Sequence, residues 1–363
     1  MKNIVYISSI CWNYSWHRQQ EMVSFFADKG YRILFVQPCR KNKPFDHFTK
    51  QVSERIWITQ SIGLPFERCF WSVNKINGWL SCRHINRVLQ ELHFHNYILW
   101  IDRVHGLDIQ RMCSNRYVIY DLVDDLFAFG KMKNKMLLLG LENRVLKRAN
   151  LLLSSSKTLM ERKIQQSRRS GESIFIPNGV DTSRFSTINR KKSDDFTIGF
   201  IGTISKRALN YELINRIAED RPNWHIEFVG PGLEDDKERL KKMGVSVFDM
   251  VSSDEIPLVL SRFDVGIIPY NTNQRDMDYV FPRKALEYLA AGLPVVSTDL
   301  TELRSLYPYI HTAKNDADFI REIEKTKEEQ IDGQERKSFS LNYDWNILLN
   351  DLQEKISSVF HEV

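Results

Sequence analysis

The sequence predicts an α/β protein with two doubly wound domains, each built on a parallel sheet covered by helices on both faces. Strand-like apolar runs alternate with helix-like stretches along the whole 363-residue chain. The runs are almost continuously apolar, which is typical of parallel strands buried on both faces. The series pauses at the polar, charged residues 181–195 and restarts at Phe196. The chain is also long enough for two domains of ordinary size, so residues 181–195 are the expected linker.

Each apolar run predicts one strand. In the first domain these runs are residues 3–8, 31–37, 55–60, 97–102, 117–123, 150–155 and 173–178. In the second they are residues 196–202, 225–230, 245–249, 264–270 and 293–298. The first run is short and is followed by Trp, His and Arg rather than by a small-residue cleavage site, so it indicates a buried strand and not a signal peptide. No run approaches the roughly 18 apolar residues that a membrane-spanning helix needs.

Helices are expected between these strands. Residues 17–30 carry Met22, Phe25 and Phe26 on one face, and Gly30 ends the segment. Further helices are expected near residues 208–219, 234–243, 254–262, 283–291 and 314–328, and apolar spacing predicts a last one within residues 339–360.

Charge is divided unevenly between the two domains. The net charge of +5 is the sum of +13 over residues 1–180 and −8 over the remainder. A basic first half indicates an anionic partner such as phosphates, a membrane surface or nucleic acid, although a solvated basic face explains the charge equally well. Nucleic acid is disfavoured because no recognition motif accompanies the charge. The five cysteines are widely spaced and form no Cys-x-x-Cys pair, which suits a reducing cytosol.

Glycine turns follow the first two strands of the second domain. Gly202 and Thr203 end the first strand, and Lys206 and Arg207 precede a predicted helix. A strand, a glycine turn and a helix N-terminus together can bind a phosphate group, because free N–H groups point at the anion. Gly230 ends the second strand and would let a ligand approach the backbone. Tight turns alone explain such glycines about as often.

The stretch FPRKALEYLAAGLPVVST, residues 281–298, predicts a helix with Pro282 in its first turn, ended by Gly292. Lys284 and Glu287 lie three residues apart on one side of it. A nucleoside diphosphate needs a cation for its phosphates and a carboxylate for its ribose hydroxyls, and a helix N-terminus adds its dipole to the cation. The alternative is an ordinary surface ion pair of small value.

Six segments in this order resemble the GT-B glycosyltransferases, especially the family 4-like (group 1) members. They are KRANLLLSSSKTLMERK, IPNGVDTSRF, IGFIGTIS, RPNWHIEFVGP, FDVGIIPY and FPRKALEYLAAGLPVVST. The resemblance implies two Rossmann-like domains facing a central cleft. It implies an acceptor domain over residues 1–180, a nucleotide-sugar domain over residues 181–339, and a C-terminal helix, residues 340–363, packing back on the first domain.

The resemblance also implies roles for particular residues. Glu287 would bind the donor ribose and Lys284 the diphosphate, while the loop Gly202–Arg207 would close over the phosphates. The reaction would transfer a hexose-type sugar in the assembly of a bacterial surface polysaccharide. A UDP-sugar is the favoured donor. No metal is required, because Lys284, loop N–H groups and helix dipoles can offset the charge of the leaving diphosphate.

Two departures from the family pattern concern the donor sugar and the acceptor. Family members that retain the anomeric configuration usually carry a second Glu eight residues before the one that matches Glu287, but this chain has Tyr279 there. The usual glycine-rich loop after the first strand is replaced by CWNYSWHRQ. Its side chains Trp12, Tyr14, Trp16 and His17 suit a sugar-binding pocket, and they suit a local aromatic core equally well.

A catalytic base is expected where strand 117–123 runs out at Asp124-Asp125. An inverting transfer needs a carboxylate to take the proton of the acceptor hydroxyl, and Asp124 is the preferred choice. The alternative for either residue is an N-cap of a following helix. Further acceptor-site candidates are Arg18, Arg103 and His105.

Basic and aromatic residues of the first domain suit an anionic membrane surface. They are Trp71, Lys75, Trp79, Leu80, Arg83, Arg87, Lys131, Lys133 and Lys135. The resemblance implies the same, since many relatives act on lipid-linked acceptors, so we expect a cytoplasmic protein held peripherally at the inner face of the cytoplasmic membrane. The remaining alternatives are a GT-B sugar-nucleotide epimerase and a non-catalytic sugar-binding or scaffolding relative. A Rossmann dehydrogenase is disfavoured because the dinucleotide fingerprint is absent.

Overall fold

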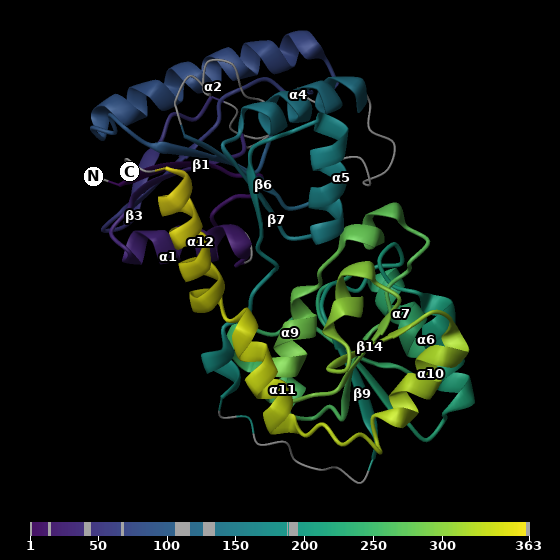
Figure 1. Cartoon of the computed structure of the whole chain (residues 1–363). Coiled ribbons are helices and arrows are strands. Elements are labelled where there is room, and N and C mark those ends of the chain that lie inside the picture. Colours follow the sequence, from purple (N-terminus) through teal and green to yellow (C-terminus); the bar gives the residue numbers. More distant parts are fainter. Residues whose placement is uncertain are drawn as a thin grey trace. The chain divides into compact units, whose positions relative to one another are not determined.

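The chain forms two compact units, shown in Figure 1. The computed structural model describes residues 2–13, 16–39, 45–66, 69–105, 117–125, 135–186, 188 and 195–360. Unit 1 comprises Met1–Ile176 with Leu349–Val363, and unit 2 comprises Pro177–Leu348. The chain therefore leaves unit 1 slightly before the expected boundary after residue 180, and it returns at Leu349 rather than at residue 340.

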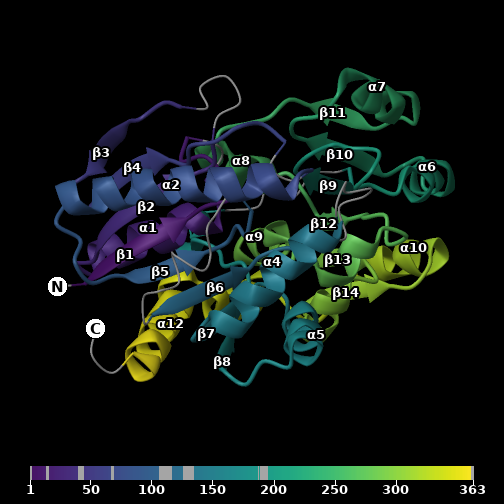
Figure 2. The same cartoon turned by 90° about the horizontal axis from the view of Figure 1, so that it is seen from above.

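Unit 1 contains an eight-stranded sheet within the described residues, in the order β3-β4-β2-β1-β5-β6-β7-β8 (Figure 2). The strands are β1 Asn3–Ile7, β2 Arg32–Gln37, β3 Thr49–Ser53, β4 Ile56–Gln60, β5 Ile98–Ile101, β6 Val118–Leu122, β7 Leu151–Ser154 and β8 Glu172–Phe175. Neighbours pair in parallel except β3 with β4. The apolar runs predicted every strand but β3, an edge strand exposed along its length that needs no apolar side chains.

Within the described residues, the helices of unit 1 are α1 Arg18–Asp28, α2 Trp71–Glu91, α4 Lys135–Arg148 and α5 Lys157–Ser167, joined by most of α12 Trp345–Val359. Helix α1 buries Met22 and Phe26, and Gly30 follows it with φ +90°. Helix α12 begins later than residue 340 because a 3₁₀ turn, η5 Leu341–Tyr343, precedes it. The end of α12 packs on unit 1, where the Phe360 ring lies 4.9 Å from that of Tyr117.

Unit 2 contains a six-stranded parallel sheet in the order β11-β10-β9-β12-β13-β14. Its strands are β9 Thr197–Ile201, β10 His225–Val229, β11 Ser246–Phe248, β12 Val265–Ile268, β13 Val295–Thr298 and β14 Ile310–Ala313. Its helices are α6 Tyr211–Asp220, α7 Glu234–Lys242, α8 Ile256–Leu260, α9 Arg283–Ala290, α10 Asp316–Lys325 and α11 Gly333–Ser340, with 3₁₀ helices η1 Thr182–Phe185, η2 Ser253–Glu255, η3 Arg275–Tyr279 and η4 Thr301–Leu306. The short strand β14 is the one strand here that the sequence prediction lacked.

The first part of the expected linker is packed structure. Residues 182–185 form η1, and the Phe185 side chain is buried. The N–H and hydroxyl groups of Thr182 both donate to the carboxylate of Asp344. Residues 187 and 189–194 lie outside the described residues. Residues 182–185 therefore belong to the folded part of unit 2, although their polar composition predicted a linker.

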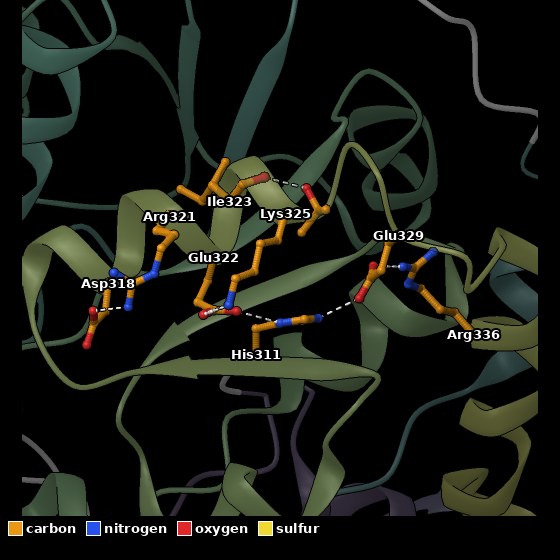
Figure 3. A network of polar contacts seen from close by, with 9 residues as sticks. His311, Asp318, Arg321, Glu322, Ile323, Lys325, Glu329 and Arg336 are labelled. Carbon is orange, nitrogen blue, oxygen red and sulfur yellow. Dashed lines mark hydrogen bonds and ion pairs between the residues drawn. The ribbon is translucent and has the colours of Figure 1, made fainter.

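A histidine buried in unit 2 lies between two carboxylates (Figure 3). His311, on β14, contacts Glu322 through Nδ1 at 2.8 Å and Glu329 through Nε2 at 2.5 Å. Glu322 also accepts a hydrogen bond from Lys325, and Glu329 pairs with Arg336. The hydrogen bond to Glu329 raises the pKa of His311, despite the opposing effect of burial. The His311 ring therefore connects β14 to α10 and, through Glu329 and Arg336, to α11.

This network predicts a pH-dependent contribution to stability. Because the pKa of His311 is raised in the folded state, its contribution is complete below the ordinary pKa of about 6.5 and is lost as the pH rises through the folded value. Hydrogen bonds to charged groups contribute about 1.5–3 kcal/mol. We therefore expect His311→Gln to lower Tm by several degrees at pH 6 and by much less at pH 9, measured by thermal unfolding. His225→Gln, at an exposed histidine of β10, is the control; an equal loss at both pH values would contradict a charged His311.

Candidate functional site

Each of the two sheets reverses its strand order at one place. In unit 1 the chain builds outward from β1 through β2 to β4, and β5 then pairs with the other side of β1. In unit 2 it builds from β9 through β10 to β11, and β12 then pairs with the other side of β9. Ligands of doubly wound sheets bind beyond the carboxyl ends of the strands at such a switch point. Ligand contacts are therefore expected from the residues that follow β1 and β5 in unit 1, and β9 and β12 in unit 2.

The two glycine turns of unit 2 are in contact with each other. Gly202 follows β9, and its N–H donates to the carbonyl of Val229 at the end of β10. Gly230 comes next, and a Cβ there would lie 2.1 Å from the Gly202 carbonyl oxygen. Both residues have positive φ angles, +147° and +152°, which favour glycine. The backbone at the end of β9 and β10 is thus left without side chains.

Lys284 lies against this bare backbone. It is the second residue of α9, and its Nζ donates to the hydroxyl of Tyr270, just after β12, at 2.6 Å. The same Nζ is 4.9 Å from the ring centroid of Phe200 on β9. A Cβ on Gly202 would lie 3.0 Å from Lys284 Nζ. The structure therefore brings Lys284 and Gly202 together at the switch point of unit 2.

Glu287 has a different partner from the one its spacing suggests. Its side chain is largely buried and pairs with Arg283, one turn earlier in α9, with Arg283 Nε 2.7 Å from Glu287 Oε1. Lys284 bonds to Tyr270 instead, so the surface ion pair considered for Lys284 and Glu287 is replaced by two separate contacts. Pro282 is the N-cap residue, and α9 begins at Arg283. The expectation that Pro282 lies inside the first turn is corrected by one residue.

The basic loop after Gly202 is longer than predicted. Helix α6 begins at Tyr211 and is capped by Asn210, whose side chain accepts from the N–H of Leu213. The expected helix N-terminus directly after Lys206 and Arg207 is therefore absent from the described residues 203–210. Thr203, Lys206 and Arg207 are all exposed. The loop is fixed at Ile204, whose N–H donates to the carbonyl of Pro231 at 2.7 Å.

A carboxylate that sequence reasoning missed lies at the switch point of unit 1. Asp102 directly follows β5, and its Oδ2 accepts hydrogen bonds from Ser9 Oγ at 3.2 Å and from Gln19 Nε2 at 3.0 Å. Burial raises the pKa of the Asp102 carboxyl to about 7, against the opposing effect of those hydrogen bonds. A carboxyl with this pKa can exchange a proton near neutral pH. The sequence signal for Asp102 was its place at the end of the predicted strand 97–102, directly before the candidates Arg103 and His105.

The pair Asp124-Asp125 is split by the fold. Asp125 is buried, with oxygens 3.3 Å from Arg162 Nη1 and 3.4 Å from Lys163 Nζ. Lys163 also contacts Glu142 at 2.5 Å, so Asp125 belongs to an internal ion-pair network of unit 1. Asp124 is exposed. The helix that either residue would cap falls within residues 126–134, outside the described residues.

Three of the charged acceptor-site candidates are buried in unit 1. Arg18 pairs with Asp121 at 3.3 Å and donates to the carbonyl of Ile176 at 2.6 Å. Arg103 is buried and donates to the hydroxyl of Ser61. His105 is also buried. The guanidinium groups of Arg18 and Arg103 thus bond to interior partners, and the acceptor role of all three residues stays a prediction.

The aromatic loop before α1 is partly a local core. The Trp12 ring packs on buried Phe35, with centroids 5.1 Å apart, and Trp16 meets Trp12 at 6.1 Å while remaining 46% exposed. His17 is the N-cap of α1, where it forms a capping box with Gln20. Tyr14 lies outside the described residues. Among the described members of this group, Trp16 and His17 are exposed and available to a sugar.

Neither a metal site nor a membrane span is found where the structure describes the chain. Over those residues, no group of three or more His, Cys, Asp or Glu side chains is arranged to hold a metal ion. In the same part of the chain, each helix is too short or too polar to cross a bilayer.

Comparisons with known proteins indicate a family and a fold. Residues 195–326 match the family model "Glycosyl transferases group 1". A curated relative, the teichuronic acid biosynthesis glycosyltransferase TuaH of Bacillus subtilis (strain 168), is 28% identical over 233 residues, which is 59% of this chain and 58% of the relative. The chain thus matches a little over half the length of that relative.

Solved structures resemble the chain over its whole length. Sucrose-phosphate synthase of Thermosynechococcus elongatus superposes with a TM-score of 0.76 at 12% identity, covering 100% of both chains. Anabaena HepE, solved in complex with UDP, superposes with a TM-score of 0.68 at 16% identity, covering 99% of this chain and 100% of that one. The predicted fold class is confirmed by these neighbours, and the predicted family resemblance by the match over residues 195–326, which contains Gly202, Gly230, Lys284 and Glu287.

Proposed function

From the group 1 glycosyltransferase domain in residues 195–326 of a GT-B fold, we propose that this chain is a glycosyltransferase. It transfers a sugar from a nucleotide diphosphate sugar to a glycan acceptor in the assembly of a bacterial surface polysaccharide. The main structural support for this proposal is the position of Lys284, which Tyr270 holds against the bare backbone of Gly202. Teichuronic acid biosynthesis in the name of TuaH supports the polysaccharide assignment.

The donor site belongs to unit 2. Lys284 supplies the positive charge that binds the diphosphate and stabilises it as the leaving group. Glu287 accepts hydrogen bonds from the ribose hydroxyls, with Arg283 holding its carboxylate in place. Thr203, Lys206 and Arg207 lie in an exposed loop that can approach the phosphates. HepE was solved with UDP, which supports UDP as the donor nucleotide.

The acceptor side belongs to unit 1. Asp102 and exposed Asp124 are the two candidates for the base that takes the proton of the acceptor hydroxyl. Asp102 is better suited than Asp124 to act as this base, because it lies at the switch point and its pKa is raised to about 7. Trp16 offers a ring for stacking on a sugar. The acceptor is lipid-linked, and the protein is peripheral to the inner face of the cytoplasmic membrane, in keeping with the charge of +13 over residues 1–180.

The test is a thermal-shift panel of UDP, GDP, CMP, TDP and their sugars on the purified chain. A ligand that binds only the native state raises Tm by mass action, and we expect UDP and one UDP-sugar to do so. That UDP-sugar is then incubated with lipid extract, and product is sought in the lipid fraction. Conversion of the sugar nucleotide to its epimer without transfer would favour the epimerase. Failure of every nucleotide to stabilise a folded sample would favour the non-catalytic relative.

A further inference from the structure

Helix α2 shows a reversed distribution of polar and apolar side chains in its first half. Figures 1 and 2 show it as the long blue helix of unit 1. Its exposed side carries Trp71 and Trp79, which are 53% and 44% exposed, and also Ile76. Phe66 and Phe70, just before the helix, are exposed as well. In a helix that only packs on its own domain, the apolar side faces inward.

The buried side of the same half is polar and well bonded. The Asn77 side chain accepts from the N–H of Leu64 and donates to its carbonyl, both at 2.7 Å. The Ser81 hydroxyl makes the same pair of contacts with Ile62, at 3.1 and 2.8 Å. Gly63 leaves room for Asn77, since a Cβ there would lie 2.3 Å from Asn77 Cγ. These contacts hold the helix in place without help from the exposed aromatic rings.

The exposed side is an alternation of aromatic and basic residues. Trp71, Lys75, Trp79, Arg83 and Arg87 follow one another at intervals of four, so each lies beside the next in a stripe that winds gradually along the exposed surface of the helix. Lys75 Nζ lies 3.8 Å from the ring centroid of Trp71, and the Arg83 guanidinium 5.8 Å from that of Trp79. No Asp or Glu occurs in residues 71–90. We call this set of five residues the α2 stripe.

We propose that the α2 stripe, with Phe66 and Phe70, docks on an anionic phospholipid surface with the helix lying flat on it. Trp rings favour the boundary between head groups and acyl chains, because there the apolar ring can contact the acyl chains while its N–H stays hydrated. Lys and Arg extend from an apolar stem to a charged tip and pair with lipid phosphates. This deepens the proposed membrane association, on which it rests, by assigning it to one helix face.

Charge and composition select a lipid surface over other partners. The stripe lacks acidic residues, so it complements a uniformly anionic surface rather than a mixed protein surface. Its two tryptophans are separated by a cation, and the apolar neighbours Ile76, Phe66 and Phe70 add area that a bilayer can accept without a matching pocket. The exposed aromatic area is otherwise a liability for a protein in water.

The test is flotation of the whole chain with vesicles of phosphatidylcholine alone and with 30% phosphatidylglycerol. We expect binding to the anionic vesicles, a blue shift of tryptophan fluorescence on binding, and weakening by salt. Trp71→Ala/Trp79→Ala should weaken binding about tenfold. Lys75→Gln/Arg83→Gln should weaken it about 25-fold, since each basic residue near an anionic surface contributes about fivefold.

Two matched variants control for non-specific effects. Lys29→Gln removes another cation of unit 1, which lies 5.1 Å from the Phe25 ring, and Tyr307→Ala removes an exposed aromatic ring of unit 2; both should bind like the wild type. Stripe variants that bind as well as the controls would overturn the proposal. So would a wild-type dimer that the tryptophan variants convert to monomer, because a second copy would then cover the stripe. The assay uses no donor sugar, so failure of sugar transfer leaves its outcome unaffected.

Discussion

Lys284→Ala should weaken binding of UDP by about 10- to 100-fold while leaving binding of uridine almost unchanged. Hydrogen bonds that involve a charged group contribute about 1.5–3 kcal/mol, and each 1.4 kcal/mol is tenfold in affinity. The ammonium of Lys284 is positioned by Tyr270 beside Gly202, so its loss removes charge from the phosphate position and spares the nucleoside. Calorimetric titration with UDP and with uridine measures both effects.

Two further variants sharpen this expectation. Gly202→Ala should also weaken the binding of UDP. The new methyl group would press on Lys284, and the backbone has a φ angle that alanine rarely adopts. Arg216→Ala, which removes a half-exposed cation of α6 paired with Asp220, should bind UDP normally. Equal weakening of UDP and uridine by Lys284→Ala would show that the residue supports the fold of the site rather than the phosphates.

Asp102→Asn should lower turnover by about 10²- to 10⁴-fold, the range expected when a general base is removed. Binding of the donor should be unchanged, because Asp102 belongs to unit 1 and the residues proposed to bind the donor belong to unit 2. In the wild type, kcat/KM should rise with pH through about 7, the pKa to which burial raises this carboxyl, because a base works in its deprotonated form. UDP release from the stabilising UDP-sugar, with lipid extract as the source of acceptor, provides the assay.

Asp124→Asn separates the two candidate bases. If Asp102 is the base, Asp124→Asn should retain most of the turnover and the same pH profile. The reverse result, with activity lost at Asp124 and kept at Asp102, would assign the base to the exposed carboxylate. Asp102→Asn is expected to fold, because an Asn at this position avoids the cost of ionising a buried carboxyl. A loss of turnover would then reflect the loss of the base. Thermal unfolding at pH 8 checks this.

The sequence by itself determined the fold class and most of the elements. Buried parallel strands must be apolar on both faces, so each leaves a readable run, and β3 escaped because an exposed edge strand has no such need. The residue types of the proposed donor site could also be predicted from the sequence: glycines where side chains cannot fit, and Lys284 and Glu287 at the start of a helix. Their order along the chain carried the family resemblance.

Partners were decided by the tertiary structure. Spacing could not tell that Glu287 pairs with Arg283 while Lys284 bonds to Tyr270, because Tyr270 comes from the end of another strand. Asp102 and Asp125 are both aspartates that follow strands, yet one joins Ser9 and Gln19 and the other joins Arg162 and Lys163. The pairing of β5 with the free side of β1 places Asp102 beside Ser9, which follows β1. Burial at that place raises the pKa of the Asp102 carboxyl.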